Sequence, residues 1–433
     1  MRVLWFTNTP SLAAAHFNLP SIGGGWIESL EEKIKAVQNI ELGIAFSHGK
    51  ANLEKFSKDK TTYYAIPDKR SKVKKFTYRH LNLISNEELL EYCVEIINDF
   101  KPDIINVFGT EGAFGLISDR TKIPVVIHLQ GIMTIYEKKW FSSGINKWNL
   151  LYHSSIKGIL KGYSLIHHYY SFSKAAERER EIFKKCKYFM GRTDWDRRIT
   201  AVLAPGSRYY CCDEILKKGF YRNVWDKKPQ ENKIFLSTIQ PNIYKGLETV
   251  LETAILLKEL DLFKFTWFVI GISNADSMVK VFEQKVGRKF KDFNIVFSGS
   301  RQSGDLINAE LNADIFIHPS HIDNSPNSVC EAMLLGMPVL ATHTGGTGSL
   351  LTDKKEGILI QDGDPYAMAG AVLDLIRDPL YAAELGRNAR VRAIKRHDAD
   401  QILNSLIDIY SGIINYSANR YLSGYTKAVG IGV

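Results

Sequence analysis

Short apolar runs alternate with amphipathic helical patterns along almost the whole chain, and this alternation constrains the fold most. Each run has the length of a buried strand and is apolar throughout, which is typical of parallel sheets covered by helices on both faces. The segments between them keep apolar residues at helical spacing, as over 87–100. The expected strands are 3–7, 42–46, 104–107, 125–129 and 188–190 in the first half, and 234–239, 265–270, 295–297, 315–318, 338–341 and 358–360 in the second.

The alternation occurs twice, which predicts an α/β protein of two doubly wound, Rossmann-like domains that face each other across a cleft. The chain has 433 residues, enough for two domains of roughly 200 each. We expect an N-terminal domain over 1–205, a polar linker over 206–232 and a C-terminal domain over 233–398. A last helix over 399–433 is expected to pack back toward the N-terminal domain.

The composition is that of a soluble globular protein, with 45% hydrophobic and 24% charged residues. It excludes a disordered or multi-span membrane chain, and no apolar run is long enough to predict a transmembrane helix. The N-terminal residues lack the apolar region of a signal peptide. The five cysteines form no CxxC pair, which favours a reducing compartment. We therefore expect a cytoplasmic protein.

The positive charge lies entirely in the first half. Residues 1–228 hold 36 Lys and Arg against 24 Asp and Glu, within a net charge of +9 for the chain. Such a half attracts nucleic acid, phospholipid headgroups or a phosphorylated acceptor, unless it is simply a solvated lysine-rich surface. Between Trp140 and Tyr170, aromatic residues alternate with lysines that include Lys157 and Lys161, a pattern that suits an anionic membrane surface. No nucleic-acid recognition motif is present, so we expect no nucleic-acid partner.

The strongest candidate site follows the fourth expected strand of the second half. That strand leads into a polar loop with Asp323, and a short helix capped by Asn327 or Ser328 carries Glu331. The free N–H groups at the start of such a helix attract a phosphate. The two carboxylates flank this position and accept hydrogen bonds from hydroxyl groups. The arrangement suits a phosphorylated sugar ligand.

These residues also carry a resemblance to a known family. Seven residues separate Asp323 from Glu331, which begins the run Glu-Ala-Met-Leu-Leu-Gly-Met-Pro-Val, with Thr-Gly-Gly shortly after it. The pattern resembles the Glu-x7-Glu signature of family 4 glycosyltransferases, closely in the second half of the chain and loosely in the first. The resemblance implies a GT-B fold and a retaining, metal-independent transfer from a nucleotide sugar.

By that resemblance, Glu331 holds the ribose, Asp323 holds hydroxyls of the donor sugar, and backbone N–H groups near Asn327 and Ser328 hold the diphosphate. The family usually has Glu at the first acidic position. The shorter side chain of Asp323 therefore bears on which donor is used.

A second element lies after the first strand of the second half. The family commonly has Arg-x4-Lys-Gly there, with both cations on the diphosphate. Lys245 matches the lysine, but Gln240 stands at the arginine position. We favour Arg301 as the substitute, although a Lys-Gly pair also occurs as a plain helix start.

Three glycines, Gly23, Gly24 and Gly25, follow the first strand and open a helix. They are either a flexible loop or, as the resemblance implies, the glycine loop that faces the donor phosphate. They do not form a dinucleotide-binding fingerprint, because the G-x-G-x-x-G spacing is absent. His128 ends an expected strand; the family often has a donor-contacting histidine there, and a strand-capping histidine is the alternative. Glu111 ends the preceding strand and is an acceptor-side candidate.

We expect no metal and no cofactor. Asp194 and Asp196 form an Asp-x-Asp pattern, but the pattern is better explained as the start of a helix capped by Thr193 or Asp194.

The sequence therefore predicts a retaining glycosyltransferase of surface or capsular polysaccharide synthesis. Its donor is a nucleotide sugar, and its acceptor is a glycan or a polyprenyl-pyrophosphate-linked sugar that binds the basic half, with peripheral contact to the inner face of the plasma membrane. Two alternatives stay open. One is an epimerase-like GT-B enzyme, and the other is a catalytically impaired GT-B module that binds anionic membrane.

Overall fold

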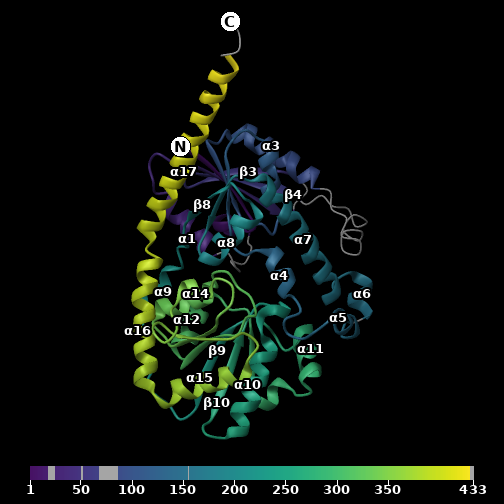
Figure 1. Ribbon diagram of the computed structural model, residues 1–433, viewed down its shortest axis with the longest axis vertical. Coiled ribbons are helices and arrows are strands. Elements are labelled where there is room, and N and C mark those ends of the chain that lie inside the picture. The colour runs from purple at the N-terminus through teal and green to yellow at the C-terminus, as the bar shows by residue number, and fades with distance from the viewer. Residues whose placement is uncertain (18–24, 50–51, 68–85, 155, 430–433) are drawn as a thin grey trace.

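Two parallel sheets, one in each domain, form the centre of the molecule (Figure 1). The computed structural model describes residues 1–17, 25–49, 52–67, 86–154 and 156–429. The first sheet has the order β3-β4-β2-β1-β5-β6-β7-β8, and β3 is its antiparallel edge strand. Its strands are β1 (Arg2–Thr7), β2 (Glu41–His48), β3 (Glu54–Lys58), β4 (Thr61–Pro67), β5 (Ile104–Phe108), β6 (Val125–His128), β7 (Tyr188–Gly191) and β8 (Arg208–Cys211).

The second sheet is parallel throughout and has the order β11-β10-β9-β12-β13-β14. Its strand order reverses next to β9, the kind of switch point at which ligands bind in doubly wound folds. The predicted pair of doubly wound domains is thus confirmed. The strands are β9 (Lys233–Thr238), β10 (Phe265–Ile270), β11 (Ile295–Gly299), β12 (Ile315–His318), β13 (Val339–Thr342) and β14 (Ile358–Ile360).

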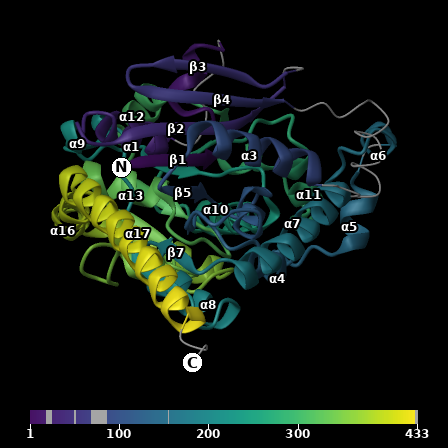
Figure 2. The same cartoon turned by 90° about the horizontal axis from the view of Figure 1, so that it is seen from above.

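Helices pack around both sheets (Figures 1 and 2). Those of the N-terminal domain are α1 (Gly25–Ile34), α3 (Glu87–Phe100), α4 (Met133–Lys139), α5 (Lys147–Tyr152), α6 (Ile156–Lys161), α7 (Leu165–Lys185), α8 (Asp194–Leu203) and α9 (Lys218–Arg222). Those that follow are α10 (Leu247–Leu260), α11 (Ser277–Val286), α12 (Ser303–Leu311), α13 (Asn327–Leu335), α14 (Thr347–Leu350), α15 (Pro365–Arg377), α16 (Pro379–Arg396) and α17 (Ala399–Val429). The described residues also form the short 3-10 helices η1 (Ser11–Ala15), η2 (Phe114–Asp119), η3 (Ile243–Lys245) and η4 (Phe290–Phe293).

The region predicted as a linker, 206–232, has more structure than expected. It holds β8, which pairs in parallel with β7, and the short helix α9. This strand was not predicted because β8 is an edge strand with exposed or half-buried residues, rather than an apolar run. The edge pair β3 and β4 was likewise absent from the expected strands.

The long helix α17 runs from the C-terminal domain along the N-terminal one (Figure 1). Near its start Lys33 of α1 pairs with Asp400 at 2.8 Å. Further along, the indole N–H of Trp5 donates to the hydroxyl of Tyr410 at 3.1 Å, in the core. Within the described residues, no helix is long and apolar enough to span a bilayer.

Candidate functional site

The loops after β6 and β12 bring residues of the two domains into contact around Asp323. The carboxylate of Asp323 is almost fully buried and lies 2.5 Å from the ammonium of Lys245 and 3.3 Å from Nε2 of His318. From the other domain, the hydroxyl of Tyr136 donates to it at 3.4 Å. Burial alone would raise the pKa of Asp323, but Lys245 and His318 outweigh this effect and lower it well below the usual range. The carboxyl group of Asp323 therefore stays ionised at neutral pH.

Lys245 owes its position to a tight turn before α10. Gly246 has φ +73°, a left-handed conformation, and a Cβ there would lie 2.0 Å from the backbone oxygen of Pro319. The turn needs glycine for both reasons. It places the ammonium of Lys245 against the carboxylate of Asp323.

The helix α13 begins at Asn327, and its N-cap is Pro326, without a side-chain cap, so the predicted capping by Asn327 or Ser328 is wrong. Both residues are instead half-buried in the first turn of the helix. Its sequence contains no charged residue in that turn, so the positive end of the helix dipole is left for a ligand. Glu331 lies one turn further along and is partly buried.

Glu331 has an unusual neighbour. Glu310, on α12, is fully buried, and neither of its carboxyl oxygens has a hydrogen-bond partner among the described residues. Burial raises the pKa of Glu331 to about 8, against the attraction of Lys217, and the pKa of Glu310 is raised further by burial and by Glu331. Burial thus favours the protonated form of both carboxyl groups, whereas Asp323 is held in its ionised form.

His128 ends β6 beneath the first turn of α1. Its ring stacks on Phe108, with centroids 5.4 Å apart, and lies edge-on to Trp26 at 5.1 Å. Burial, together with the positive charge of Arg192, lowers the pKa of His128 to about 3. The imidazole is therefore neutral at physiological pH.

Glu111 follows β5 and is partly buried beside Asn8, whose amide donates to it at 3.2 Å. Burial raises the pKa of Glu111 to about 7, despite the hydrogen bond from Asn8 and the charge of Arg192. The carboxyl group is thus poised to exchange a proton near neutral pH.

The structure does not bring the other predicted site residues that it describes into contact with Asp323 and Lys245. Gln240 and Arg301 follow β9 and β11 and are exposed. Gly25 is the first residue of α1, whereas Gly23 and Gly24 lie outside the described residues. Lys157 and Lys161 are exposed on α6, which projects from the side of the molecule (Figure 1).

Sequence reasoning missed several residues of the interface. Tyr136 lies in the other domain from its partner, and nothing in its local pattern signals the contact. Arg192 and Thr193 do have a signal, because they are polar residues at the carboxyl end of an expected strand. Thr193 caps α8 and forms a capping box with Asp196, which confirms the helix start expected there.

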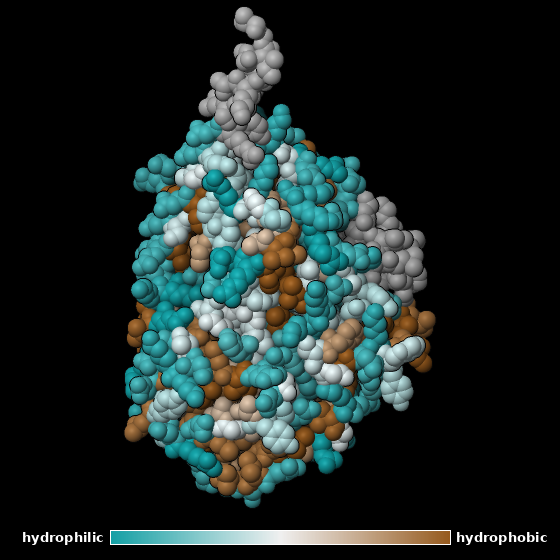
Figure 3. All heavy atoms as spheres, viewed as in Figure 1, coloured by the Kyte–Doolittle hydropathy of each residue, from teal (hydrophilic) through white to brown (hydrophobic). Residues whose placement is uncertain are grey.

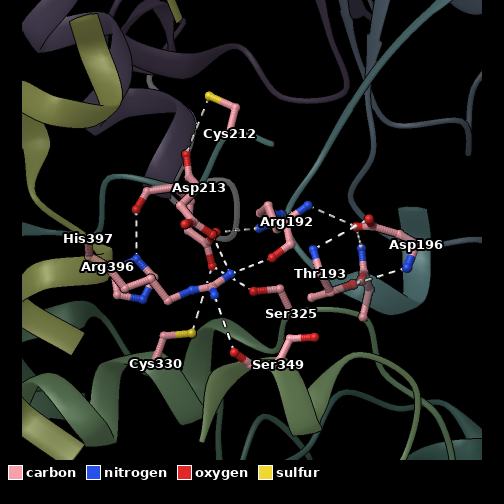
Figure 4. Close-up of polar contacts among 12 residues, drawn as sticks. Arg192, Thr193, Asp196, Cys212, Asp213, Ser325, Cys330, Ser349, Arg396 and His397 are labelled. Atoms are coloured by element: carbon pink, nitrogen blue, oxygen red, sulfur yellow. Dashed lines mark hydrogen bonds and ion pairs between the residues drawn. The ribbon is translucent and has the colours of Figure 1, made fainter. Parts of the chain in front are cut away.

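Buried charges cross the interface beside this loop (Figure 4). Arg192 pairs with Glu214 at 3.3 Å, and Ser325 donates to Glu214 at 3.0 Å. Within the part of the chain that the structure describes, one group has metal-like spacing: Glu214, Cys330 and His397, with donor atoms within 4.8 Å. Burial alone would raise the pKa of Glu214, but Arg192 and His397 hold it at about 2. Because its charge is already matched by arginine, we assign this group to an ion-pair network.

The paired Rossmann-like domains, with a polar loop and helix at their junction, define a GT-B protein. Sucrose-phosphate synthase from Thermosynechococcus elongatus shares this fold with a TM-score of 0.70, over 96% of this chain and all of that one, at 12% identity. HepE from Anabaena, solved with UDP-glucose, has a TM-score of 0.61 over 95% of this chain and 100% of that one, at 15% identity. Identities this low show the fold alone, and they confirm the GT-B prediction.

The model of the family "Glycosyl transferases group 1" matches residues 222–392. D-inositol 3-phosphate glycosyltransferase from Streptomyces avermitilis is 30% identical over 125 residues, which are 29% of this chain and 26% of that protein. The capsular polysaccharide biosynthesis glycosyltransferase CapM of Staphylococcus aureus is 26% identical over 116 residues, 27% of this chain and 30% of that protein. The matched stretches thus span under a third of these relatives. Residues 222–392 therefore resemble the group 1 glycosyltransferases, the family whose signature the sequence also resembles.

Proposed function

We propose that the protein is a retaining glycosyltransferase that moves a sugar from a nucleotide-diphosphate donor to a glycan or lipid-linked acceptor. One observation carries the proposal: the buried pair of Asp323 and Lys245 adjoins the first turn of α13, the helix that also carries Glu331. A fixed negative charge, a cation and free helix N–H groups are what a sugar linked to a diphosphate needs.

Each part of the donor has a partner in this arrangement. Asp323 accepts hydrogen bonds from sugar hydroxyls, and Glu331 accepts them from the ribose. Lys245 and the N–H groups of Asn327 and Ser328 bind the diphosphate. The solved complexes of HepE contain UDP, UDP-glucose, or UDP and glucose, which supports a nucleoside diphosphate sugar as the donor class.

The chemical step follows from the same geometry. The bond from the anomeric carbon to the diphosphate oxygen breaks, and the acceptor oxygen forms a bond on the same face of the sugar. The departing phosphate oxygen accepts the acceptor's proton, while Lys245 and the positive end of α13 stabilise the charge that develops on the diphosphate. His128 was expected at the cleft, but its imidazole is fully buried and is neutral because its pKa is about 3, so we assign it no contact with the donor. Positioning and electrostatic stabilisation then account for catalysis.

The acceptor side is proposed from the projection formed by α5 and α6. Its apolar side chains are unusually exposed, with Trp148 77%, Tyr152 83% and Ile156 78% accessible. Lys157 and Lys161 lie on the same short projection, exposed as well. Apolar side chains that insert beside lysines suit an interface with anionic lipid, where a polyprenyl-linked acceptor resides.

The lateral position of this projection is visible in the space-filling view, where apolar residues lie at the edge that bears α5 and α6 (Figure 3). The name of CapM, a capsular polysaccharide glycosyltransferase, supports a surface polysaccharide as the product. A lipid-linked acceptor explains the projection and the positive charge of the N-terminal half together.

The experiment that tests the donor proposal is a thermal-shift panel of nucleoside diphosphates and nucleotide sugars, with and without magnesium. A ligand at about 1,000 times its Kd stabilises the folded state by about 4 kcal/mol. We expect one nucleotide series to raise the melting temperature equally with and without magnesium. No shift across the panel would contradict a transferase and favour the membrane-binding module.

A further inference from the structure

Asn324, the residue after Asp323, binds the loop between β12 and α13 to the N-terminal domain. We call this loop the candidate donor loop. The side chain of Asn324 is fully buried, and its amide makes three hydrogen bonds, all to the N-terminal domain. The hydroxyl of Thr193 donates to its oxygen at 2.6 Å. Its nitrogen donates to the carboxylate of Asp196 at 2.9 Å and to the backbone oxygen of Gln130 at 3.1 Å. The three contacts use the amide oxygen and both amide hydrogens.

The partners of Asn324 are themselves held firmly. Thr193 and Asp196 form the capping box of α8, and the carboxylate of Asp196 also accepts the backbone N–H of Arg192 at 2.9 Å. Figure 4 shows Thr193 and Asp196 linked to each other and to Arg192. Asn324 therefore docks on a preformed polar site and not on a flexible surface loop.

The candidate donor loop is also held by contacts within its own, C-terminal domain. The backbone N–H of Asn324 donates to the carboxylate of Asp323 at 3.2 Å, and the N–H of Gly346 donates to the backbone oxygen of Asp323 at 2.9 Å. A Cβ on Gly346 would lie 2.1 Å from the backbone oxygen of Asn324. A shift of the Asn324 amide would consequently move the carboxylate of Asp323.

We propose that Asn324 is a positioning residue that couples closure of the two domains to the placement of Asp323. Separating the domains would break all three amide contacts and replace them by hydrogen bonds to water. Closure makes these contacts, and it brings the hydroxyl of Tyr136 from the N-terminal domain to the carboxylate of Asp323. The role in catalysis rests on the proposed function, whereas the coupling itself is a property of the fold.

The test compares Asn324→Ala and Asn324→Asp with the unaltered full chain. The aspartate has nearly the size of asparagine, but it would set a second carboxylate against Asp196 and lose both donors. We expect both variants to increase the radius of gyration in X-ray solution scattering, and Asn324→Asp to increase it more. A residue that only fills space would give the opposite order, because alanine removes more volume.

The kinetic readout separates positioning from donor binding. Donor affinity rests on the C-terminal domain, so we expect the Kd of UDP to stay within about threefold, while kcat falls by about 100-fold. Ser349→Ala is the matched control, since Ser349 accepts a different interdomain hydrogen bond, from the backbone of Asp194 at 3.1 Å. That variant should leave kcat and the radius of gyration near the original values.

The outcomes distinguish the two proposals. An unchanged radius of gyration in both Asn324 variants, or a greater effect of alanine than of aspartate, would overturn the coupling. A kcat that falls only in step with UDP affinity would overturn it too. If no nucleoside diphosphate binds the unaltered chain, the proposed function fails, and the scattering result still decides the coupling. If one variant does not fold, the other is compared with the original chain and Ser349→Ala.

Discussion

The two domains share a doubly wound fold but present opposite kinds of binding surface. In the C-terminal domain, Asp323 and Lys245 are buried and paired, so the candidate donor site is fixed before a ligand arrives. In the N-terminal domain, the lysines and aromatic side chains of α5 and α6 are exposed on a projection. Under the proposed function, the donor would be recognised by preorganised contacts and the acceptor by charge and apolar surface.

The largest effect is expected from removing the fixed charge of the donor site. Asp323→Asn keeps the shape of the side chain but leaves Lys245 without its counter-charge. We expect kcat to fall by about 100- to 1,000-fold, the range seen when one preorganised electrostatic contact is lost. Steady-state transfer assays measure this effect. In the unaltered protein, Asp323 stays ionised between pH 5 and 9 because its pKa is low, so its protonation should not shape the pH profile.

Asp305→Asn is the matched control, because Asp305 is an exposed aspartate of the same domain. Its kinetics should match those of the original chain. Full transfer activity in Asp323→Asn would contradict the contrast between the two domains, because the donor site would then not depend on its fixed charge.

The next effect concerns Glu331, which differs from Asp323 in its ionisation. With a pKa of about 8, Glu331 is mostly protonated at pH 7, and only the carboxylate accepts hydrogen bonds from both ribose hydroxyls. We expect UDP affinity to rise up to tenfold per pH unit between pH 6.5 and 8 and to level off above that range. Titration calorimetry at several pH values measures this, and Glu331→Gln should abolish the dependence and bind weakly throughout.

The same raised pKa has a consequence for stability. The folded-state pKa of Glu331 lies above its ordinary value of 4.5, so protonation favours the folded state, and this contribution is lost as pH rises from about 4.5 through 8. Glu331→Gln should therefore be more stable than the original chain at pH 9 and nearly equal at pH 4.5. Glu384→Gln, at an exposed glutamate, should show no such difference.

For the affinity prediction, a UDP affinity of the original chain that does not change with pH would contradict the ribose role of Glu331.

The donor side could be predicted from the sequence further than the interface. Asp323, Glu331 and Lys245 follow strands of a parallel sheet, and their order along the chain is enough to bring them to one edge. Asn324 and Tyr136 could not be identified in this way, because their roles depend on how the two domains dock. Glu310 was also missed, since a lone glutamate in a helical pattern is normally a surface residue.

A smaller effect is expected on the acceptor side. Replacing Lys157 and Lys161 by alanine removes two charges from the projection, each worth about 1 kcal/mol near an anionic surface. We expect association with vesicles of phosphatidylcholine and phosphatidylglycerol to weaken by about 30-fold, with UDP affinity unchanged. Cosedimentation measures the first quantity and calorimetry the second.

Alanine at Lys264 and Lys395, two exposed lysines elsewhere, is the matched control and should change neither quantity. Equal loss of vesicle and UDP binding in the Lys157 and Lys161 variant would contradict the separation of the two surfaces. Equal vesicle binding by all three proteins would remove the lipid contact from the proposal.

The smallest effect concerns the tether between the domains. Tyr410→Phe removes the hydroxyl that accepts the buried indole N–H of Trp5, while keeping the ring in the core. An unsatisfied buried donor costs about 1–3 kcal/mol, so we expect this loss in the free energy of unfolding, measured by urea denaturation. Tyr416→Phe keeps the ring on which the guanidinium of Arg208 lies and should cost under about 0.5 kcal/mol. If the domains unfold as one unit, Tyr410→Phe moves a single transition. If only part of the transition moves, the C-terminal domain stays folded when the N-terminal domain unfolds. The two domains would then be independent in stability as well as in the surfaces they present.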